Sequence, residues 1–350
     1  MLDVTLLEKN LKPLRIIDTY TDFIWTERFG GAGDFQLTLP TSMEMIEDLI
    51  PGRYMHIAES NKLMVIETVE LYSNATSGHL MTIAGRSLES ILSYRIVWTK
   101  TTLDGTLESG IQTLLNENII SPSNSARRVA NLIFEPCGDA EIAEFTLVGQ
   151  YTGENLYDVI SQICEAYEIG FEIFLNDNNQ FVFRLVKGTD RSYSQYENSP
   201  VVFSPRFDNL LDSKYRMDAV DFKTSAFVVA EVNGSTTSTE AIYVEAEGLD
   251  RRELYVEASD VEQTSGMSND KFLQLLRQRG IEELYEYQIR QDFDCSIDTH
   301  IGPRFGVDYY IGDIVQVEDD NGIQSQCRVS ELIRSVKPSG YYEYPAFTLL

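Results

Sequence analysis

Alternation of apolar and polar positions dominates the first hundred residues and predicts β-strands. In "DFQLTLP", Phe35, Leu37 and Leu39 alternate with polar residues, a pattern typical of a half-buried strand that ends at Pro40. Residues 1–98 are therefore expected to form a β-rich domain with short helical pieces. Further apolar segments of strand length, separated by turn-forming residues, follow at 54–60, 62–73 and 79–87.

A helical period replaces this alternation between residues 99 and 195. Apolar side chains recur at helical spacing in two segments, at Leu107, Ile111, Leu114 and Leu115, and again at Leu156, Val159, Ile160, Ile163 and Cys164. Two alternating segments then flank Asp177-Asn178-Asn179, which predicts a β-hairpin. Helices followed by a hairpin predict a small α+β lobe at 99–195.

Residues 196–350 return to strand patterns after the polar, turn-rich segment 187–200. One amphipathic helix is expected at 269–288, capped by Asn269 and Asp270. Asn321-Gly322 between two apolar runs is the strongest hairpin signal in the chain. The fold class predicted for the whole chain is α+β and rich in β-structure, with two β-rich domains separated by the lobe.

Composition and charge limit the classes of partner that this protein can bind. The 350 residues are 43% hydrophobic and 11% aromatic, enough apolar surface to build substantial cores. Fifty-five acidic against 28 basic residues give a formal net charge of −27. A protein that wraps DNA needs the opposite sign, because phosphate contacts dominate its affinity. A negative surface fits a protein that nucleic acid passes without sticking, and it equally fits simple solubility.

Membrane and redox signals are weak. No apolar segment approaches the ~18 residues of a membrane span, and the first residues do not resemble a signal peptide. No stable membrane insertion is therefore expected. The cysteines form no C-x-x-C pair and are expected to be reduced, mostly in cores; they are Cys137, Cys164, Cys295 and Cys327.

The segment "FGGAGDF" raises the question of a phosphate-binding loop. A P-loop needs a Lys and a following helix, whereas Gly33 is followed by Asp34 and a predicted strand. A dinucleotide fingerprint needs a further glycine at the position of Gln36. We therefore expect Gly30, Gly31 and Gly33 to permit a bend into an edge strand.

The histidines offer little support for nucleophilic catalysis. No G-x-S-x-G occurs, and no cysteine is close to a histidine in sequence. His56 and His79 fall in alternating segments, where histidines are usually structural. His300 follows "DCSID", so Asp294, Asp298 and His300 form a conceivable metal or hydrolase set.

Acidic clusters have a simpler interpretation. Asp292, Asp294 and Asp298 have even spacings and are expected on one face of a strand. Glu318, Asp319 and Asp320 sit at a predicted turn but do not match a calcium loop. With so many carboxylates, solvated acidic faces are expected at both places.

Aromatic residues gather in "YYIG" (309–312) and "SGYYEYPAF" (339–347). Such clusters can stack on sugars or pack between subunits, where tyrosine is enriched. The interface is the favoured interpretation, and sugar stacking stays open.

Five segments in a fixed order resemble a known family. They are "FGGAGDFQLTLP", "MTIAGRSLESILSYRIV", "GENLYDVISQICEAYEIGFEI", "VVFSPRFDNLLDSKYRMD" and "YYIGDIVQVEDDNGIQSQCRVSE". Together they resemble the tail-tip or baseplate hub proteins of bacteriophages, in particular the Gp37-like siphovirus tail proteins. The same module is similar to the N-terminal hub of tail-associated lysins. The resemblance covers residues 15 to 348.

The resemblance implies a fold and an assembly. Residues 1–98 and 196–350 would be tail-tube-like β-barrel domains, and 99–195 a lobe beside them. Three chains would form a ring of six such domains that joins the hexameric tail tube to the tip of a virion or phage-like particle. The implied partners are a homotrimer, distal tail and tail tube proteins, tape-measure protein, tip or receptor-binding proteins, and DNA in transit.

Enzymatic activity is not expected. Tail-associated lysins carry an enzyme after the hub, whereas this chain stops at "YPAFTLL". We therefore predict no catalytic, cofactor-binding or metal-binding residues and no cofactor. Two alternatives remain: a receptor- or carbohydrate-binding tail module on the lobe or the Tyr-rich end, and a cell-wall hydrolase that uses Asp294, Asp298 or His300.

Overall fold

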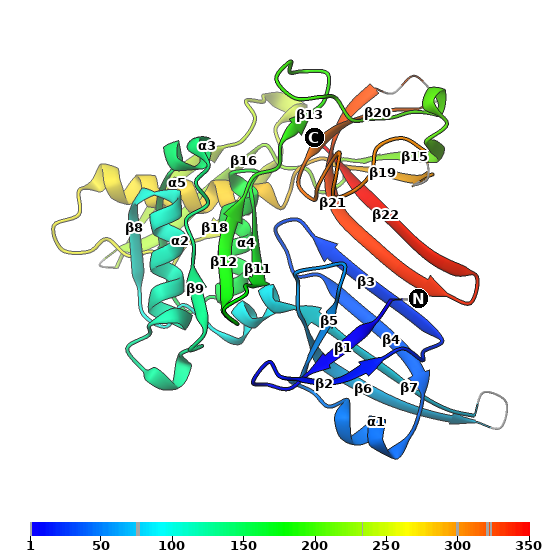
Figure 1. Ribbon diagram of the computed structural model, residues 1–350. Helices are drawn as coiled ribbons and strands as arrows, with labels where there is room; N and C mark the ends of the chain where they lie inside the picture. The colour runs from blue at the N-terminus through cyan, green and yellow to red at the C-terminus, as the bar shows by residue number, and fades with distance from the viewer. Residues whose placement is uncertain (1, 75–77, 233, 299–300, 320–321, 323) are drawn as a thin grey trace.

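One large sheet organises the molecule. The computed structural model describes residues 2–74, 78–232, 234–298, 301–319, 322 and 324–350. Strands make up 43% and helices 21% of the chain, so the predicted β-rich α+β class is confirmed. Within the described residues no sheet closes into a barrel. The two β-rich regions instead share one 14-stranded sheet, because β3 of the first pairs with β21 of the second (Figure 1).

The first region follows the predicted alternation. Phe35, Leu37 and Leu39 are at most 2% exposed and pack with Phe23 and Trp25. β4 lies between β3 and β7, so the prediction of an edge strand is wrong. The missing N–H of Pro40 is tolerated because it falls at the last position of β4. The elements are β1 (Val4–Leu7), β2 (Pro13–Ile17), β3 (Asp22–Arg28), β4 (Asp34–Pro40), α1 (Met43–Asp48), β5 (Tyr54–Ile57), β6 (Met64–Asn74) and β7 (Gly78–Ser87).

The lobe packs its helices against the first region. Both predicted apolar helix faces are buried, and they share a core with Leu88, Ile91 and Leu92. The predicted hairpin is present, and Asn179 adopts φ +57° in its turn. The elements are η1 (Leu88–Tyr94), β8 (Thr101–Thr106), α2 (Leu107–Leu115), η2 (Asn116–Ile120), η3 (Ser125–Arg127), β9 (Leu132–Phe134), α3 (Ala140–Glu144), β10 (Thr146–Tyr151), α4 (Leu156–Ala166), β11 (Gly170–Leu175) and β12 (Phe181–Val186).

The second region completes the large sheet. β20 and β21 pair antiparallel, which confirms the hairpin predicted around residues 321–322, although residues 320, 321 and 323 lie outside the described ones. Aromatic side chains Phe203, Tyr309 and Phe347 fill its core. The elements are β13 (Asp190–Arg191), β14 (Val202–Phe203), η4 (Pro205–Phe207), β15 (Leu210–Asp218), β19 (Arg290–Ile297), β20 (Ile314–Glu318), β21 (Gln324–Lys337) and β22 (Gly340–Leu349).

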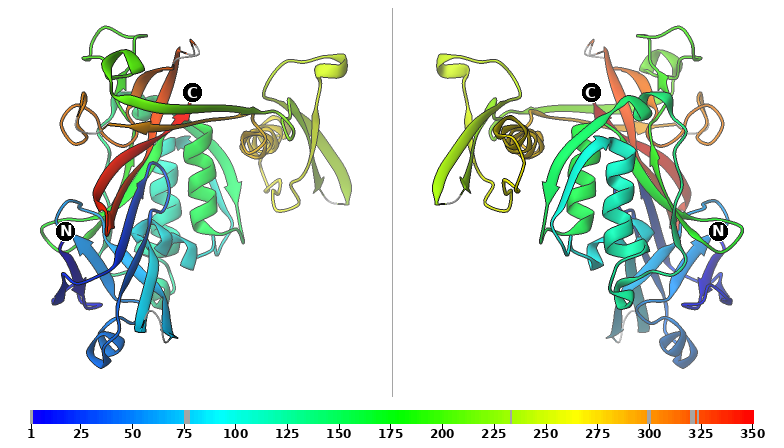
Figure 2. Two further views of the ribbon diagram at one scale, coloured as in Figure 1. Left: turned by 90° about the vertical axis from the view of Figure 1, so that its right-hand side faces the viewer. Right: turned by 90° about the vertical axis from the view of Figure 1, so that its left-hand side faces the viewer.

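A small unit is inserted between β15 and β19. These two strands form an arm that carries it away from the rest of the large sheet (Figure 2). The predicted long helix covers this unit's own sheet and also contacts α4 and β10 of the lobe. Its N-cap is Ser268 rather than Asn269 or Asp270, since the Ser268 hydroxyl accepts from Lys271 N. The elements are β16 (Ser225–Val232), β17 (Ser235–Ile242), η5 (Gly248–Asp250), β18 (Glu253–Glu257) and α5 (Asn269–Tyr285).

The two ends of the large sheet are open. In the described part of the chain β2 pairs only with β1, and β15 only with β19. Both edges expose large apolar side chains, including Ile16 at 62% and Met217 at 57% exposure. Exposed apolar edge strands are uncommon in monomers, because they favour pairing with another chain.

Candidate functional site

A seam between β3 and β21 joins the two β-rich regions. The strands pair antiparallel from Phe23↔Val336 to Arg28↔Glu331. The Arg28 Nε donates to Glu331 Oε1 at 2.7 Å across this seam. The seam is therefore held by an ion pair at its end as well as by the backbone ladder.

A buried ion pair crosses the same seam further along. The Arg334 guanidinium, only 3% exposed, bonds to Glu27, and its Nε donates to Glu343 at 2.8 Å. Trp25 Nε1 donates to Glu27 at 3.2 Å. Burial alone would lower the pKa of Arg334, but Glu27 and Glu343 outweigh it and raise that pKa. These contacts fix the register of the two regions, since a slip would leave Glu27 buried without its cation.

The glycine loop lies where the first region, the lobe and the second region meet. A Cβ at Gly33 would lie 2.1 Å from the Thr26 carbonyl oxygen, so only glycine fits there. Gly30 has φ +68° and approaches Gly170 of the lobe closely. Ala32 N donates to the Tyr157 hydroxyl at 3.0 Å. The loop serves packing between regions, and its Ala32 and Gly33 amides donate to the Tyr157 and Ser87 hydroxyls.

Phe29 occupies the centre of this junction. Its ring lies against Gly170 and Gly312, where a side chain would collide with it. The Arg328 guanidinium lies 4.8 Å from the ring centroid, and burial lowers the pKa of that arginine. The Phe29 side chain of the first region thus contacts both the lobe and the second region.

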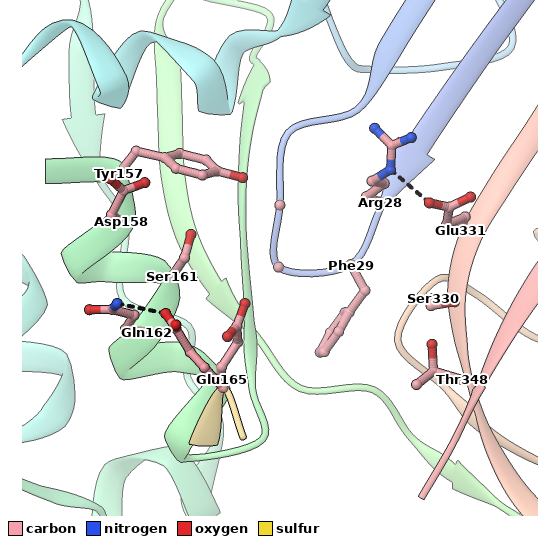
Figure 3. A pocket seen from close by; sticks show the side chains of 13 residues that line it. Arg28, Phe29, Tyr157, Asp158, Ser161, Gln162, Glu165, Ser330, Glu331 and Thr348 are labelled. Atoms are coloured by element: carbon pink, nitrogen blue, oxygen red, sulfur yellow. Dashed lines mark hydrogen bonds and ion pairs between the residues drawn. The ribbon is translucent and has the colours of Figure 1, made fainter. Parts of the chain in front are cut away.

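A cleft of about 580 Å³ opens beside Phe29 (Figure 3). Helix α4 forms one wall with Tyr157, Ser161 and Glu165, and the seam forms the other with Arg28 and Glu331. Burial, followed by the nearby Glu286, raises the pKa of Glu165. The opposed acidic and basic groups make this a polar junction between regions, and its walls come from every part except the inserted sheet.

A buried charge network ties the first region to the lobe. Lys62 Nζ lies 2.7 Å from Glu89 Oε1 and 3.1 Å from Glu172 Oε2. Glu89 also accepts from Ile173 N at 2.8 Å. Burial would lower the pKa of Lys62, but Glu89 and Glu172 raise it overall. The network pairs this cation with two carboxylates inside the protein.

A second network fastens the inserted unit to the lobe. Arg279 of α5 bonds to Glu154 at 2.8 Å and to Asp260 at 2.9 Å. The Tyr151 hydroxyl donates to Glu282 at 2.7 Å. Burial raises the pKa of Glu154 to about 7, against the opposing effect of Arg279. Three carboxylates around one guanidinium make this contact sensitive to protonation.

The described residues provide no chemistry for a bound metal. Within that part of the chain, no group of three or more His, Cys, Asp or Glu side chains is placed to hold an ion. None of its helices has the length and apolarity needed to cross a lipid bilayer.

Comparison with protein-family models identifies the family of this chain. A protein-family model described as Siphovirus ReqiPepy6 Gp37-like protein matches residues 3–346. The chain belongs to this Gp37-like family. Gp37-like proteins are tail proteins of phages, so this chain is a phage tail protein. A search of curated protein sequences finds none with significant similarity to it.

Solved structures share the fold of this Gp37-like chain. A tail protein from Neisseria meningitidis MC58 aligns with TM-score 0.57 at 14% identity over 100% of this chain and 96% of its own. The 43 kDa tail protein of prophage MuSo2 from Shewanella oneidensis gives TM-score 0.57 and 14% identity over 99% and 98%. Prophage tail protein gp18 from Listeria monocytogenes EGD-e gives 0.55 and 14% over 99% and 94%. The common fold extends over nearly the whole length of each.

The histidines of the Gp37-like chain are scattered. His56 is half-buried on β5, and burial lowers its pKa. His79 on β7 is exposed, and its Nδ1 lies 2.8 Å from the Ser73 hydroxyl. His300 lies outside the described residues. The two described histidines therefore lie on different strands, β5 and β7.

The aspartate set is only partly described. Asp292 and Asp294 lie on β19, opposite Arg216 and Lys214 of β15, and their side chains are outside the description. Asp298 follows the end of that strand and is half-buried. A set of Asp294, Asp298 and His300 stays a hypothesis.

The second acidic cluster departs from the prediction of a solvated face. Glu318 and Asp319 are 8% and 9% exposed at the end of β20. β20 is an interior strand that pairs with β21 on one side and with β13 and β14 on the other. Asp320 lies outside the described residues.

The aromatic clusters divide into buried and exposed members. Tyr309 is 1% exposed and belongs to the core, whereas Tyr310 is 49% exposed. Tyr341, Tyr342 and Tyr344 are exposed on β22 near the β21–β22 turn. The exposure of these rings is compatible with both interpretations, contact between subunits and stacking on sugars.

Cys137, Cys164 and Cys327 are free thiols, as expected. Cys164 and Cys327 are buried, and burial raises the pKa of Cys327 to about 12. Cys137 and Cys295 are only partly buried.

The buried ion pairs were not predicted from the sequence, although the sequence contains one signal for them. Phe23, Trp25 and Glu27 alternate on one face of β3, so Glu27 occupies a core position. Leu332, Arg334 and Val336 do the same on β21. Opposite charges at core positions of two strands are a detectable signal for strand pairing, because each needs a buried partner.

Proposed function

We propose that this chain is the structural hub of a phage or phage-like tail tip, a homotrimeric ring that joins the hexameric tail tube to the tip. The seam between β3 and β21 is the observation that carries the proposal. It places two β-rich regions of one chain side by side in one continuous sheet. Three such chains present six regions, the number that a hexameric tube above requires.

The open edges supply the contacts between chains. The β2 edge of one copy and the β15 edge of the next would pair, and the ring would then have no free edge. The apolar side chains of Ile16 and Met217, exposed in one chain, would be covered in this arrangement. Within the described residues neither edge closes against the other, so closure would need further copies.

The charge suits a conduit. One chain carries −27, and three copies carry three times that value. An acidic lumen would repel DNA phosphates, so tape-measure protein and DNA would pass without adhering. The proposed neighbours are distal tail and tail tube proteins on one side and tip or receptor-binding proteins on the other, in a virion tail assembled in the bacterial cytoplasm.

The proposed domain organisation keeps the ranges predicted from the sequence. Residues 1–98 and 196–350 would form the ring, with the lobe at 99–195 outside it. The unit inserted between β15 and β19 would lie beside the lobe, at the end of the arm that these two strands form. This function requires no catalysis, so isolated protein is expected to leave purified cell walls intact. Clearing that Asp298→Ala abolishes would instead establish the hydrolase alternative.

Mass measurement tests the ring directly. Light scattering of the purified chain, alone and mixed with distal tail and tail tube proteins, is expected to give a species of three chains. Electron microscopy of that species should show threefold symmetry around a pore of tail-tube width. A strict monomer that forms no ring even with those partners contradicts the proposal.

A further inference from the structure

A surface pocket of about 310 Å³ lies apart from the junction cleft. One side is the end of η1 and the segment after it, with Tyr94, Arg95, Ile96 and Trp98, and the other is the η3 turn with Arg127. The junction cleft described above shares no lining residue with this pocket. Nothing in the proposed ring assigns it a role.

The pocket is a basic spot on an acidic protein. Among the described residues, no carboxylate forms an ion pair with Arg95 or Arg127, although the chain has 55 acidic side chains. Arg95 Nε donates to the Arg127 carbonyl at 2.9 Å, and Arg127 Nη2 donates to the Ile96 carbonyl at 2.7 Å. Burial, then the neighbouring Arg95, lowers the pKa of Arg127. Two like charges are thus held together by backbone carbonyls, with N–H groups left for an anion.

Aromatic surface adjoins these cations. Trp98 is 62% exposed and Tyr94 is 52% exposed. The Arg127 guanidinium lies 4.9 Å from the Trp98 ring centroid and so orients the indole. The Tyr94 hydroxyl donates to Glu67 at 3.2 Å, which fixes the second ring. Exposed, oriented rings of this kind are platforms for flat apolar faces.

The backbone here offers no site for an added peptide strand. The Arg95 carbonyl accepts from Leu156 N at 2.9 Å. The Val97 N–H donates to the Glu154 carbonyl, and its own carbonyl accepts from Gly153 N. Because these groups are already paired, a peptide cannot bind by extending a sheet. Recognition has to use the side chains, through ring stacking and guanidinium contacts.

We propose that this pocket binds an anionic bacterial surface glycan, with Arg95 and Arg127 holding its phosphate or carboxylate and Trp98 stacking on a sugar ring. Guanidinium groups suit both anions because they donate two parallel hydrogen bonds. The excess negative charge elsewhere on the chain would repel such a polymer, so binding would be confined to this spot. The inference adds adsorption to the proposed hub role and holds whether or not the ring closes.

Binding of defined polymers to the full chain tests the proposal. The probes are poly(glycerol phosphate), polygalacturonate, neutral dextran and poly-glutamate, measured by calorimetry at low and physiological salt. We expect binding to one or both anionic glycans, which also identifies the anion, and none to dextran. Trp98→Ala and Arg127→Gln should each weaken binding about tenfold, the effect of one lost charge-assisted or stacking contact.

Matched variants separate recognition from bulk charge. Arg127→Lys keeps the charge but loses the paired hydrogen bonds, so it should also bind more weakly while unfolding at the wild-type temperature. Arg304→Gln removes one exposed arginine elsewhere, whose side chain is 70% exposed, and should bind normally. The proposal is overturned if neither anionic glycan binds, if dextran binds equally, or if Arg304→Gln has the same effect as Arg127→Gln. Equal or tighter binding of poly-glutamate would overturn it in favour of an acidic protein segment.

Discussion

Lys62 and Glu89 are both buried, and they face each other where the first β-rich region meets the lobe. Removing the cation leaves Glu89 buried without its counter-charge. Lys62→Met is therefore expected to lower the free energy of unfolding by about 3–5 kcal/mol. Urea denaturation of the purified chain measures this change.

A more exposed pair provides the control for this prediction. Arg86 pairs with Glu67 at 2.8 Å, and its side chain is 45% exposed. Arg86→Met should change stability by no more than about 1 kcal/mol, because water solvates the remaining carboxylate. Equal losses for both variants would show that burial of the Lys62 pair does not determine its contribution.

Gly33 and Gly31 provide a second comparison at single residues. A Cβ at Gly33 would overlap the Thr26 carbonyl, whereas a Cβ at Gly31 would meet only the Tyr157 hydroxyl at 3.3 Å. Gly33→Ala should cost about 1–3 kcal/mol, because the backbone of β3 has to move. Gly31→Ala should stay within about 1 kcal/mol. Thermal unfolding of both variants checks the order, and an equally stable Gly33→Ala would contradict it.

Elements differ in how far their sequences determine them. The strand with Phe35, Leu37 and Leu39 and the helix at 156–166 were predictable, since local periodicity reports which face is buried. Periodicity alone does not predict the seam between β3 and β21, because strand pairing over 303 residues depends on tertiary contacts that it does not encode. For the same reason the partners of Lys62 and Arg279 could not be inferred from their neighbours in sequence.

The contact between α5 and the lobe is expected to weaken as pH rises. Burial raises the pKa of Glu154 from 4.5 to about 7, and burial also raises the pKa of Glu282 and of Glu283. A raised pKa means that the docked state binds protons more tightly than the unfolded one. The stability that Glu154 contributes to the docked state is therefore complete below about pH 4.5 and is lost as pH rises through about 7.

Hydrogen exchange measures this effect element by element. Protection of β10 and α5, corrected for intrinsic exchange rates, should fall between pH 5.5 and pH 8, whereas protection of β3 and β4 should not. Glu154→Gln mimics the protonated side chain and should flatten the pH profile. An unchanged profile in that variant would assign the pH dependence to other groups.

At the scale of the whole molecule, the open edges predict which substitutions prevent assembly. Ile16→Lys on β2 combined with Met217→Lys on β15 places charges on both proposed contact edges. We expect this double variant to remain folded and to give the mass of one chain under conditions in which the wild type assembles. Circular dichroism and light scattering provide the two measurements.

Leu71→Lys is the matched control for assembly. Leu71 is 57% exposed and lies on β6 where that strand pairs with β7, at Leu71↔Met81, away from the two proposed contact edges. Assembly should therefore survive this change. If Leu71→Lys disrupts the ring as strongly as the edge variant, the contacts between chains include the β6–β7 hairpin.

The pairing of β3 with β21 also imposes an order on synthesis. Arg28 and Glu331 are 303 residues apart, so β3 leaves the ribosome long before its partner exists. At typical bacterial elongation rates, about 15–60 s separate the two strands. During that time the nascent chain exposes an unpaired strand edge and cannot offer a finished sheet. The seam between the two β-rich regions can therefore form only after the last strands have been synthesised.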